Sequence, residues 1–293
     1  MLFGAIEAGG TKMVVATGDE YGNIIKKTEI KTTTPDETVG NIKEFFGESR
    51  LGALGIGAFG PVCLDEKSTD YGRIGKSPKL EWVGFSWIEA FRDLCCPISI
   101  DTDVNVAAIG EYVGGNAAGT DDFIYITIGT GIGVGVMIGG KPLHGMLHPE
   151  AGHILLPIST DDGFSGICPY HKNCFEGLAS GPAMKKRYGT EPYLITDERA
   201  WETEADYIAK AIMQYICCYS PKRIILGGGV MNSGRLFDPV RKKVLMYLND
   251  YITARELSDI ESYIVPAGLS GNQGITGALH LAQNEIRKDK ENE

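Results

Sequence analysis

Short apolar runs separated by glycine-rich turns open the chain. Residues 2–8 and 13–17 are apolar segments joined by Gly9-Gly10-Thr11-Lys12, and a third run at 23–31 follows a turn. Runs of this length bounded by turn residues predict strands. The N-terminus is therefore expected to form an antiparallel meander whose first hairpin has a glycine tip.

The same pattern returns from residue 123 onward. An apolar run at 123–128 leads through a Gly/Thr turn, which holds Thr130 and Gly131, into a further apolar run from 132. With 293 residues, the chain also exceeds the usual size of one domain. Together these features predict two lobes, each with a strand–glycine turn–strand unit.

Other segments have the period of helices or buried strands. A capping box at 34–37 predicts a helix to about residue 46, helical period covers 202–219, Ser233 is expected to start another helix, and a last helix should follow a glycine-rich turn at 268–277 and run to about 286. Strands are expected at 51–59, before Gly60-Pro61, and at 223–226, before Gly227-Gly228-Gly229.

The stretch 99–111 places two carboxylates at a strand-to-helix junction. A short strand ends at Asp101 and Asp103, and apolar residues then recur at helical spacing, which predicts an amphipathic helix. Aspartate is favoured at helix N-caps because its side chain accepts hydrogen bonds from free backbone N–H groups. A helix-capping role and a catalytic role are thus both open for each of the two carboxylates.

The glycine turns also have two interpretations. A Gly-Gly-Thr-Lys turn lets backbone N–H groups, a hydroxyl and an ammonium approach a phosphate, but it also suits an ordinary hairpin. Two such turns in two lobes could grip one polyphosphate. The run of glycines at 227–229 would let a nucleoside lie against the backbone, and it equally suits close packing.

A cluster of cysteines and histidines predicts a metal site. Cys168, His171 and Cys174 form a Cys-x-x-His-x-x-Cys pattern short enough to wrap one ion, and His153 can supply a fourth ligand. Two thiolates and two imidazoles suit a tetrahedral structural Zn²⁺. His144, His148 and His280 are interpreted as surface or satisfied histidines.

The composition of the chain limits the kinds of partner that the protein is expected to bind. The net charge of −10 argues against a nucleic-acid binder, and no apolar run is long enough to cross a membrane, so a cytoplasmic protein that binds small molecules is expected. The seven cysteines include two adjacent pairs, which do not readily bridge, so most are expected to be reduced and packed.

Five blocks of the sequence resemble the sugar kinases of the ROK family, within the actin and hexokinase superfamily. They are IEAGGTK, DTDVNVAAIGE, TIGTGIG, the segment 150–176 and LGGGVMN. The resemblance covers the whole chain and implies an α/β fold with two ribonuclease-H-like lobes that close on ATP and a sugar. It implies a small lobe of 1–116 plus about 275–293, and a large lobe of 117–274 with a zinc-binding insertion.

The resemblance also implies residue roles. Asp103 would be the general base and Asp101 a structural residue. The implied ATP-binding residues are Gly9, Gly10, Thr11, Lys12, Thr130, Gly131, Pro182, Gly227, Gly228 and Gly229. The implied sugar-binding residues are Gly60, Pro61, Thr102, Asp103, Glu150, His153 and Glu176. His153 could ligate zinc through one ring nitrogen and meet the sugar through the other, and Mg²⁺ would accompany ATP.

Two departures from the family pattern bear on the substrate. Glu7 stands where many members have Asp, which would alter how a carboxylate meets the Mg²⁺ water shell. Thr102 stands where glucose-type members have Asn. Three segments, IEAGGTK, AFGPVCLD and SPKLEW, are similar to the bacterial fructokinase subgroup.

We therefore expect an ATP-dependent kinase that makes fructose 6-phosphate. Mannose, glucose or another hexose is the alternative substrate. A sugar-responsive regulator is the competing class, and it is disfavoured because such members carry a helix-turn-helix ahead of the phosphate hairpin, which here begins at Ile6. Family members are commonly homodimers.

Overall fold

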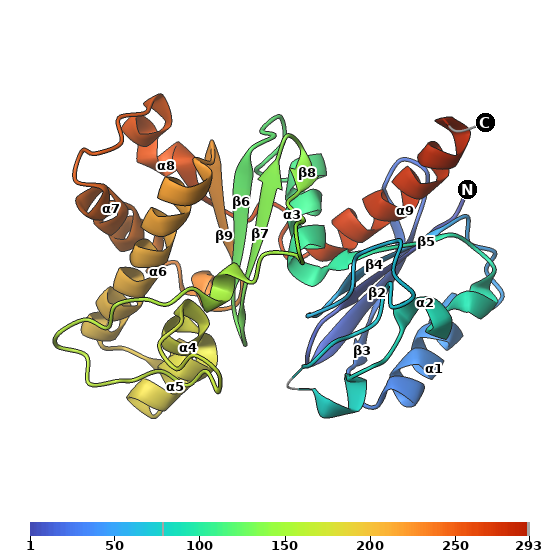
Figure 1. Cartoon of the computed structure of the whole chain (residues 1–293), viewed down its shortest axis with the longest axis horizontal. Helices are drawn as coiled ribbons and strands as arrows, with labels where there is room; N and C mark the ends of the chain where they lie inside the picture. Colours follow the sequence, from blue (N-terminus) through green and yellow to red (C-terminus); the bar gives the residue numbers. More distant parts are fainter. Residues whose placement is uncertain (78, 292–293) are drawn as a thin grey trace. The chain divides into compact units, whose positions relative to one another are not determined.

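The chain folds into two compact α/β units, and each is described by itself. The computed structural model describes residues 1–77 and 79–291 (Figure 1). The first unit comprises Met1–Ala118, Lys141–His148 and Gly268–Glu293, and the second comprises Gly119–Gly140 and Pro149–Ala267. Residues 141–148 and 268–274, which the sequence analysis assigned to the large lobe, thus pack with the first unit.

The first unit is built on a five-stranded mixed sheet with the order β3-β2-β1-β4-β5. Its strands are β1 (Phe3–Ala8), β2 (Lys12–Gly18), β3 (Ile24–Lys31), β4 (Leu54–Ala58) and β5 (Ile98–Thr102). The first three form the expected antiparallel meander, whereas β1, β4 and β5 run parallel. Parallel strands need crossover connections, and the helices between the strands supply them.

Helices cover both faces of this sheet. Because side chains alternate along a strand, Ile6 packs into one core with α1 (Pro35–Phe46), and Ala5 packs into another with α3 (Asp103–Gly114) and α9 (Gln273–Glu291). The N-cap half of the predicted capping box is present, since Thr34 Oγ1 accepts the Glu37 N–H. The first core also takes in the short helices η1 (Leu80–Trp82) and α2 (Trp87–Ala90), through their buried tryptophans, and η2 (Arg92–Leu94) follows them.

Two predictions about the helices of this unit are wrong. Helix α3 is not amphipathic in its first turns, because every residue at 104–111 is buried. Helix α9 begins inside the predicted glycine turn. A Cβ at Gly277 would lie 1.8 Å from the Val106 carbonyl oxygen, so this glycine permits close packing of α9 on α3 and does not form a turn.

The second unit repeats the sheet of the first. Within this unit the order is β10-β9-β6-β7, with β6 (Phe123–Ile128), β7 (Ile132–Ile138), β9 (Arg223–Gly227) and β10 (Ile264–Pro266). The two-residue strand β8 (Lys141–Pro142) belongs to the residues of the first unit. Strands β6 and β7 form an antiparallel hairpin, and β6, β9 and β10 are parallel. Each strand therefore has a counterpart at the same place in the first sheet, which confirms the internal repeat and the two-lobe α/β fold.

Helices α6 (Glu198–Tyr219) and α7 (Phe237–Leu248) pack against each other beside this sheet (Figure 1). The shorter helices of the unit are η3 (Ala151–His153), α4 (Phe175–Ala179), α5 (Gly181–Tyr188), η4 (Pro192–Leu194), η5 (Met231–Ser233), η6 (Arg255–Asp259) and α8 (Ile260–Tyr263). The predicted helix start at Ser233 is wrong. Gly234 has a φ of 69°, a left-handed conformation that ends the 3₁₀ turn before α7 begins.

All seven cysteines are free thiols, and three of them, Cys95, Cys217 and Cys218, are exposed. Among the described residues, no helix combines the length and apolar character needed to span a membrane.

Candidate functional site

Three of the predicted site segments follow the carboxyl ends of parallel strands in the first unit. Ala8 pairs with Ala58, and Ala58 pairs with Thr102. The glycine tip after β1, the Gly60-Pro61 segment after β4 and Asp103 after β5 therefore leave the same edge of the sheet. Ligands of open α/β sheets bind at this edge, so the topology gathers chemistry-bearing residues where a ligand can reach them.

The two aspartates of the central stretch have different surroundings. Asp101 is buried, and its Oδ1 accepts hydrogen bonds from Thr102 N at 2.7 Å and from Asn105 Nδ2 at 2.8 Å. Asp103 is half-buried, and its Oδ1 accepts the adjacent Val104 N–H at 2.8 Å. Asp101 is thus held inside the fold while Asp103 keeps access to solvent at the start of α3, and the structural role expected for Asp101 stays a prediction.

Thr102 and His144 make further hydrogen bonds beside the two aspartates, and the sequence did not indicate these contacts. The Thr102 side chain is buried and caps α3 by accepting the Asn105 N–H, so the predicted contact of Thr102 with a sugar stays a prediction. His144 Nε2 lies 3.0 Å from Asp101 Oδ2. The hydrogen bond with Asp101 raises the pKa of His144 above its ordinary value. Because His144 is far from Asp101 in the sequence, no local pattern indicated this contact.

The first glycine hairpin is held by its neighbouring strand. Thr32 donates its hydroxyl to the Gly9 carbonyl and its N–H to the Thr11 carbonyl. Lys12, predicted to bind phosphate, forms an ion pair with Glu29 on β3, and both side chains are more than half exposed. The hairpin backbone is therefore fixed, and the Lys12 ammonium already has a carboxylate partner.

Glu7 is a half-buried residue of β1, two positions before this hairpin tip. Its Oε2 is buried and, over residues 1–77 and 79–291, has no hydrogen-bond partner. Its carboxyl group packs on Gly274 at the start of α9, where a Cβ would lie 2.2 Å from the Glu7 carboxyl carbon. Burial raises the pKa of Glu7 to about 7, although the nearby Lys12 and Lys27 oppose the shift. Glu7, which stands where many family members have Asp, is therefore close to its pKa at neutral pH.

We expect the free energy of unfolding to fall as the pH rises through 7, and Glu7→Gln to remove this loss. Because the folded-state pKa of Glu7 lies above its ordinary value of 4.5, its contribution is fully present at low pH and is lost as the buried group ionises. A shift of this size corresponds to about 3 kcal/mol. Urea titrations between pH 5 and 8, without nucleotide or Mg²⁺, measure it.

The exposed Glu44→Gln variant is the matched control, and it should keep the pH dependence of the wild type. A difference in unfolding free energy between the wild type and Glu7→Gln that stays constant from pH 5 to 8 contradicts the prediction.

The second unit places its own glycine segments at an equivalent edge. Thr127 on β6 pairs with Gly227 on β9, so the turn at 129–131 and the glycines at 228–229 follow neighbouring parallel strands. Gly181, the first residue of α5, donates its N–H to the Gly129 carbonyl at 2.8 Å. The second hairpin therefore adjoins a helix N-terminus, and Thr130 at its tip is exposed. Pro182, the next residue of this helix, is also exposed.

Packing explains two of the three glycines after β9. A Cβ at Gly227 would lie 2.7 Å from the Tyr125 hydroxyl, and one at Gly228 would lie 2.3 Å from the Ile128 carbonyl oxygen. Gly228 also has a φ of 90°. A Cβ at Gly229 would meet open space, so packing does not require glycine at this position, and its predicted contact with a nucleotide stays a prediction.

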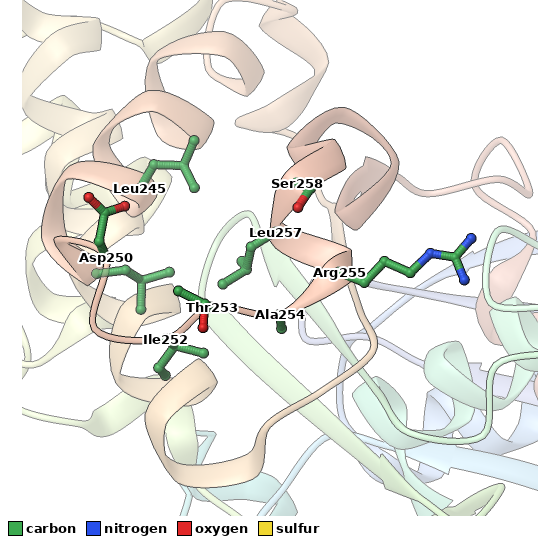
Figure 2. A pocket seen from close by; sticks show the side chains of 9 residues that line it. Leu245, Asp250, Ile252, Thr253, Ala254, Arg255, Leu257 and Ser258 are labelled. Atoms are coloured by element: carbon green, nitrogen blue, oxygen red, sulfur yellow. The ribbon is translucent and has the colours of Figure 1, made fainter.

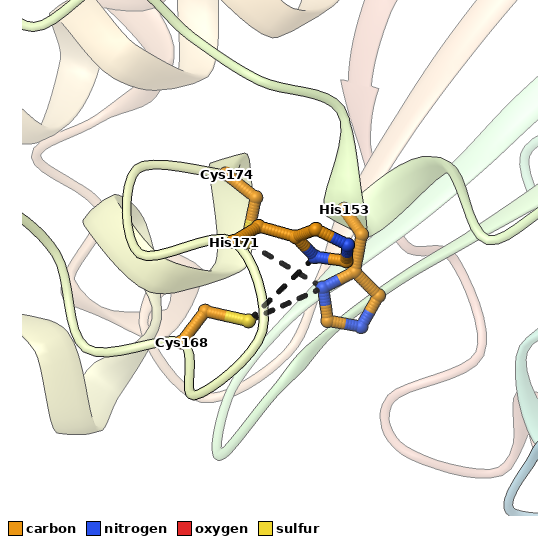
Figure 3. Close-up of side chains that lie close together, drawn as sticks. All are labelled: His153, Cys168, His171 and Cys174. Atoms are coloured by element: carbon orange, nitrogen blue, oxygen red, sulfur yellow. Dashed lines mark hydrogen bonds between the residues drawn. The ribbon is translucent and has the colours of Figure 1, made fainter.

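The predicted metal ligands converge in the second unit, as Figure 3 shows. The ligand atoms of His153, Cys168, His171 and Cys174 all lie within 4.8 Å of one another. His153 Nδ1 is 3.5 Å from Cys174 Sγ and 3.8 Å from Cys168 Sγ. A tetrahedral zinc with bonds of about 2.0–2.3 Å separates its ligands by about 3.3–3.8 Å. The four residues thus fit a tetrahedral metal site.

The electrostatics of the cluster also suit a cation. Burial, together with the neighbouring Cys168, raises the pKa of the Cys174 thiol to about 12. The Cys174 sulfur caps α4 by accepting the Gly177 N–H. Burial disfavours the charged form of the Cys174 thiol, whereas a bound metal ion would deprotonate its thiol ligands and supply a positive charge.

The metal cluster is joined to the second hairpin through Ile132. A Cβ at Gly152, beside His153, would lie 2.0 Å from the Ile132 carbonyl oxygen. Glu176, two residues after Cys174, accepts the Ile132 N–H at 2.9 Å. One oxygen of Glu176, predicted to bind a sugar, therefore already holds the hairpin, and Glu150, the other predicted sugar carboxylate, is exposed.

A pocket of about 410 Å³ lies elsewhere in the second unit, where α7 gives way to the segment 250–258 (Figure 2). Leucines and short side chains line it, and Figure 2 shows the charged end of Arg255 extending away from Leu245 and Leu257. None of the predicted site residues lines this pocket.

The chain belongs to the ROK family, whose sequence model matches residues 3–285. A putative fructokinase of Bacillus subtilis is 45% identical over 291 residues, spanning 98% of this chain and 97% of that protein. The fructokinase of Pediococcus pentosaceus is 43% identical over 289 residues, spanning 98% and 99%. A ROK family glucokinase from Streptomyces griseus, crystallised with glucose and AMPPNP, matches with a TM-score of 0.76 at 26% identity, covering 97% of this chain and 100% of that one.

Proposed function

We propose that this protein is an ATP-dependent hexose kinase that phosphorylates D-fructose to fructose 6-phosphate. The observation that carries the proposal is the identity of 45% and 43%, over nearly the whole chain, to proteins named as fructokinases. The geometry agrees with it, because each unit ends a pair of parallel strands in a glycine segment and the first unit adds a half-buried carboxylate.

Phosphoryl transfer needs an oriented nucleophile and neutralised phosphates. In the first unit, Asp103 would accept the proton of the primary hydroxyl of the sugar, and the backbone of Gly9 and Gly10 with Thr11 would hold phosphate oxygens. In the second unit, the turn carrying Thr130 and Gly131 would bind phosphate beside the N-terminus of α5, whose dipole favours anions. Pro182 and Gly229 would contact the nucleoside.

The sugar contacts are proposed residue by residue. Gly60 and Pro61 leave the same sheet edge as Asp103, and they are joined by a cis peptide bond. In the second unit, Glu150 and His153 belong to one short turn, in which the Glu150 carbonyl accepts the His153 N–H. His153 would ligate the metal through Nδ1, which leaves Nε2 for a sugar hydroxyl.

Two metals are part of the proposal. The donor set and spacing of the cluster support Zn²⁺, which prefers thiolates and imidazoles in a tetrahedron. Mg²⁺ prefers oxygen ligands, and the buried Glu7 Oε2, two positions before the first hairpin tip, is a candidate to meet its water shell. Bound with ATP, Mg²⁺ supplies charge neutralisation at the phosphates. The homodimer and the cytoplasmic location stay predictions.

A second substrate is supported by the Streptomyces griseus glucokinase, which was crystallised with glucose. Discrimination among hexoses depends on the placement of single hydroxyls, so glucose and mannose are the alternatives to test.

A coupled assay of ADP release across fructose, mannose, glucose and N-acetylated hexosamines tests the proposal. We expect fructose to give the highest kcat/KM, with a product that phosphoglucose isomerase accepts, which identifies the 6-phosphate. Glucose exceeding fructose tenfold would establish the alternative. Absence of turnover with every sugar, in protein shown to be folded and metal-loaded, would refute the kinase.

A further inference from the structure

A lysine from a distant loop lies beside the first glycine hairpin. A Cβ built on Gly10 would be 3.1 Å from Lys79 Cε and 3.8 Å from Lys79 Nζ. Lys79 belongs to the segment between β4 and β5, and it is the residue before the 3₁₀ turn η1. The hairpin tip therefore has an ammonium group next to it that does not come from the hairpin sequence.

The position of Lys79 is fixed by the aromatic core of the first unit. Its Nζ lies 5.8 Å from the centre of the Phe59 ring, a separation at which cation and ring attract. Phe59 in turn packs edge-on against Trp82, and its N–H is bonded to the Ala8 carbonyl at the end of β1. The Lys79 carbonyl accepts the Trp82 N–H, so both the backbone and the side chain are anchored beside the hairpin.

The charge of Lys79 is not matched by a carboxylate. Over residues 1–77 and 79–291, no ion pair includes Lys79, whereas Lys12 is paired with Glu29. Lys79 is half-buried, and an ammonium that has lost part of its hydration gains most from an anionic ligand. Of these two lysines, Lys79 is the one whose charge remains available for a phosphate oxygen.

We infer that Lys79 binds the transferred phosphoryl group of ATP, an inference that rests on the proposed kinase function. The reacting hydroxyl must lie near Asp103, which leaves the same sheet edge as the hairpin beside Lys79. The phosphate that meets this hydroxyl is the terminal one. Lys79 would stabilise its negative charge and would add little to the binding of ADP or of the sugar.

The variants Lys79→Met, Lys79→Arg and Lys12→Met test the inference, with Lys76→Met as the matched control, because Lys76 lies in the same loop and is exposed. We expect Lys79→Met to lower kcat/KM for ATP by about 10²-fold or more, the effect of removing one preorganised charge contact. Lys79→Arg should recover part of this loss, and Lys76→Met should stay within about threefold of the wild type, because a solvated lysine away from the substrate stabilises no charge in the transition state.

Calorimetry separates the phosphate role from other roles. In Lys79→Met, we expect the affinity for a non-hydrolysable ATP analogue to fall at least about tenfold relative to the affinity for ADP, with fructose affinity and melting temperature unchanged, since one charge-assisted contact contributes at least this factor. A rise in the KM for fructose alone, or equal losses for ATP analogue and ADP, would overturn the inference, as would a larger loss in Lys12→Met than in Lys79→Met.

Failure of the kinase proposal would be visible in the wild type, as the absence of turnover with any hexose. In that case the ratio of ATP-analogue to ADP affinity, compared between the wild type and Lys79→Met, still decides whether Lys79 binds a terminal phosphate. If Lys79→Met does not fold, Lys79→Gln takes its place in the same measurements.

Discussion

Asp103→Asn is expected to lower kcat for fructose phosphorylation by at least about 10²- to 10⁴-fold, the usual contribution of a general base. Asparagine keeps the size of the side chain and can still accept the Val104 N–H through its oxygen, so the start of α3 should not change. It cannot take up the proton of the sugar hydroxyl. Steady-state assays with saturating ATP and fructose measure the loss, and thermal melting should match the wild type.

The neighbouring Asp101→Asn provides the contrast. Asp101 is buried among three donors, from Thr102, Asn105 and His144. In Asp101→Asn, the new amide N–H group faces one of these donors and is left without an acceptor. An unsatisfied buried group of this kind lowers the free energy of unfolding by about 1–3 kcal/mol. We therefore expect Asp101→Asn to lower the melting temperature, whereas Asp103→Asn lowers turnover alone. Near-normal turnover in Asp103→Asn would end its assignment as the base.

Removal of the metal from the cluster at 153–174 is expected to disorder the surrounding segment and to abolish sugar phosphorylation. Structural zinc contributes about 10–16 kcal/mol in isolated zinc-finger peptides, which is as large as the stability of a typical domain. Cys168→Ser and Cys174→Ser each replace a buried ligand, and the exposed Cys217→Ser on α6 is the matched control. Elemental analysis should find one zinc per chain in the wild type and in the control.

The structure predicts where the disorder will concentrate. Ser159 Oγ donates to Asp206, and Tyr207 OH donates to Asp162, which also pairs with the buried Arg187. These contacts hold residues 159–162 on α5 and α6 without the metal. Hydrogen exchange after chelation should therefore show the greater loss of protection at 166–177 than at 159–162.

Two outcomes would contradict the metal prediction. One is less than one zinc per chain in protein purified without chelators. The other is full sugar phosphorylation by a serine variant that carries no metal.

Local patterns in the sequence were sufficient for most strands, although they predicted neither β8 nor β10. Apolar runs bounded by glycine or proline predicted the meander of β1, β2 and β3 and its repeat in β6 and β7, because a short apolar run with turn residues at both ends has few other stable conformations. The cysteine and histidine spacing also predicted the cluster that could hold a metal ion, since thiols and an imidazole three residues apart can turn toward one ion.

Glycine was the residue whose role the sequence could not decide. Gly277 and Gly228 suit turns as well as packing, and the choice depends on a carbonyl from a segment far away in the chain, Val106 in one case and Ile128 in the other. The period of a helix is visible in its own residues, whereas close approach of two backbones is a property of both partners. This is why α9 begins earlier than its sequence suggests.

The sequence by itself determined the two-lobe α/β fold and the two glycine hairpins, and it predicted the metal ligands and the pair Asp101 and Asp103. Only the tertiary structure decided their surroundings, because Asp101 is buried against a histidine from a separate segment whereas Asp103 is half-buried. It alone also placed Lys79 beside Gly10 while pairing Lys12 with Glu29. Burial and charge pairing depend on sheet register and on contacts between distant residues, and no local period encodes them.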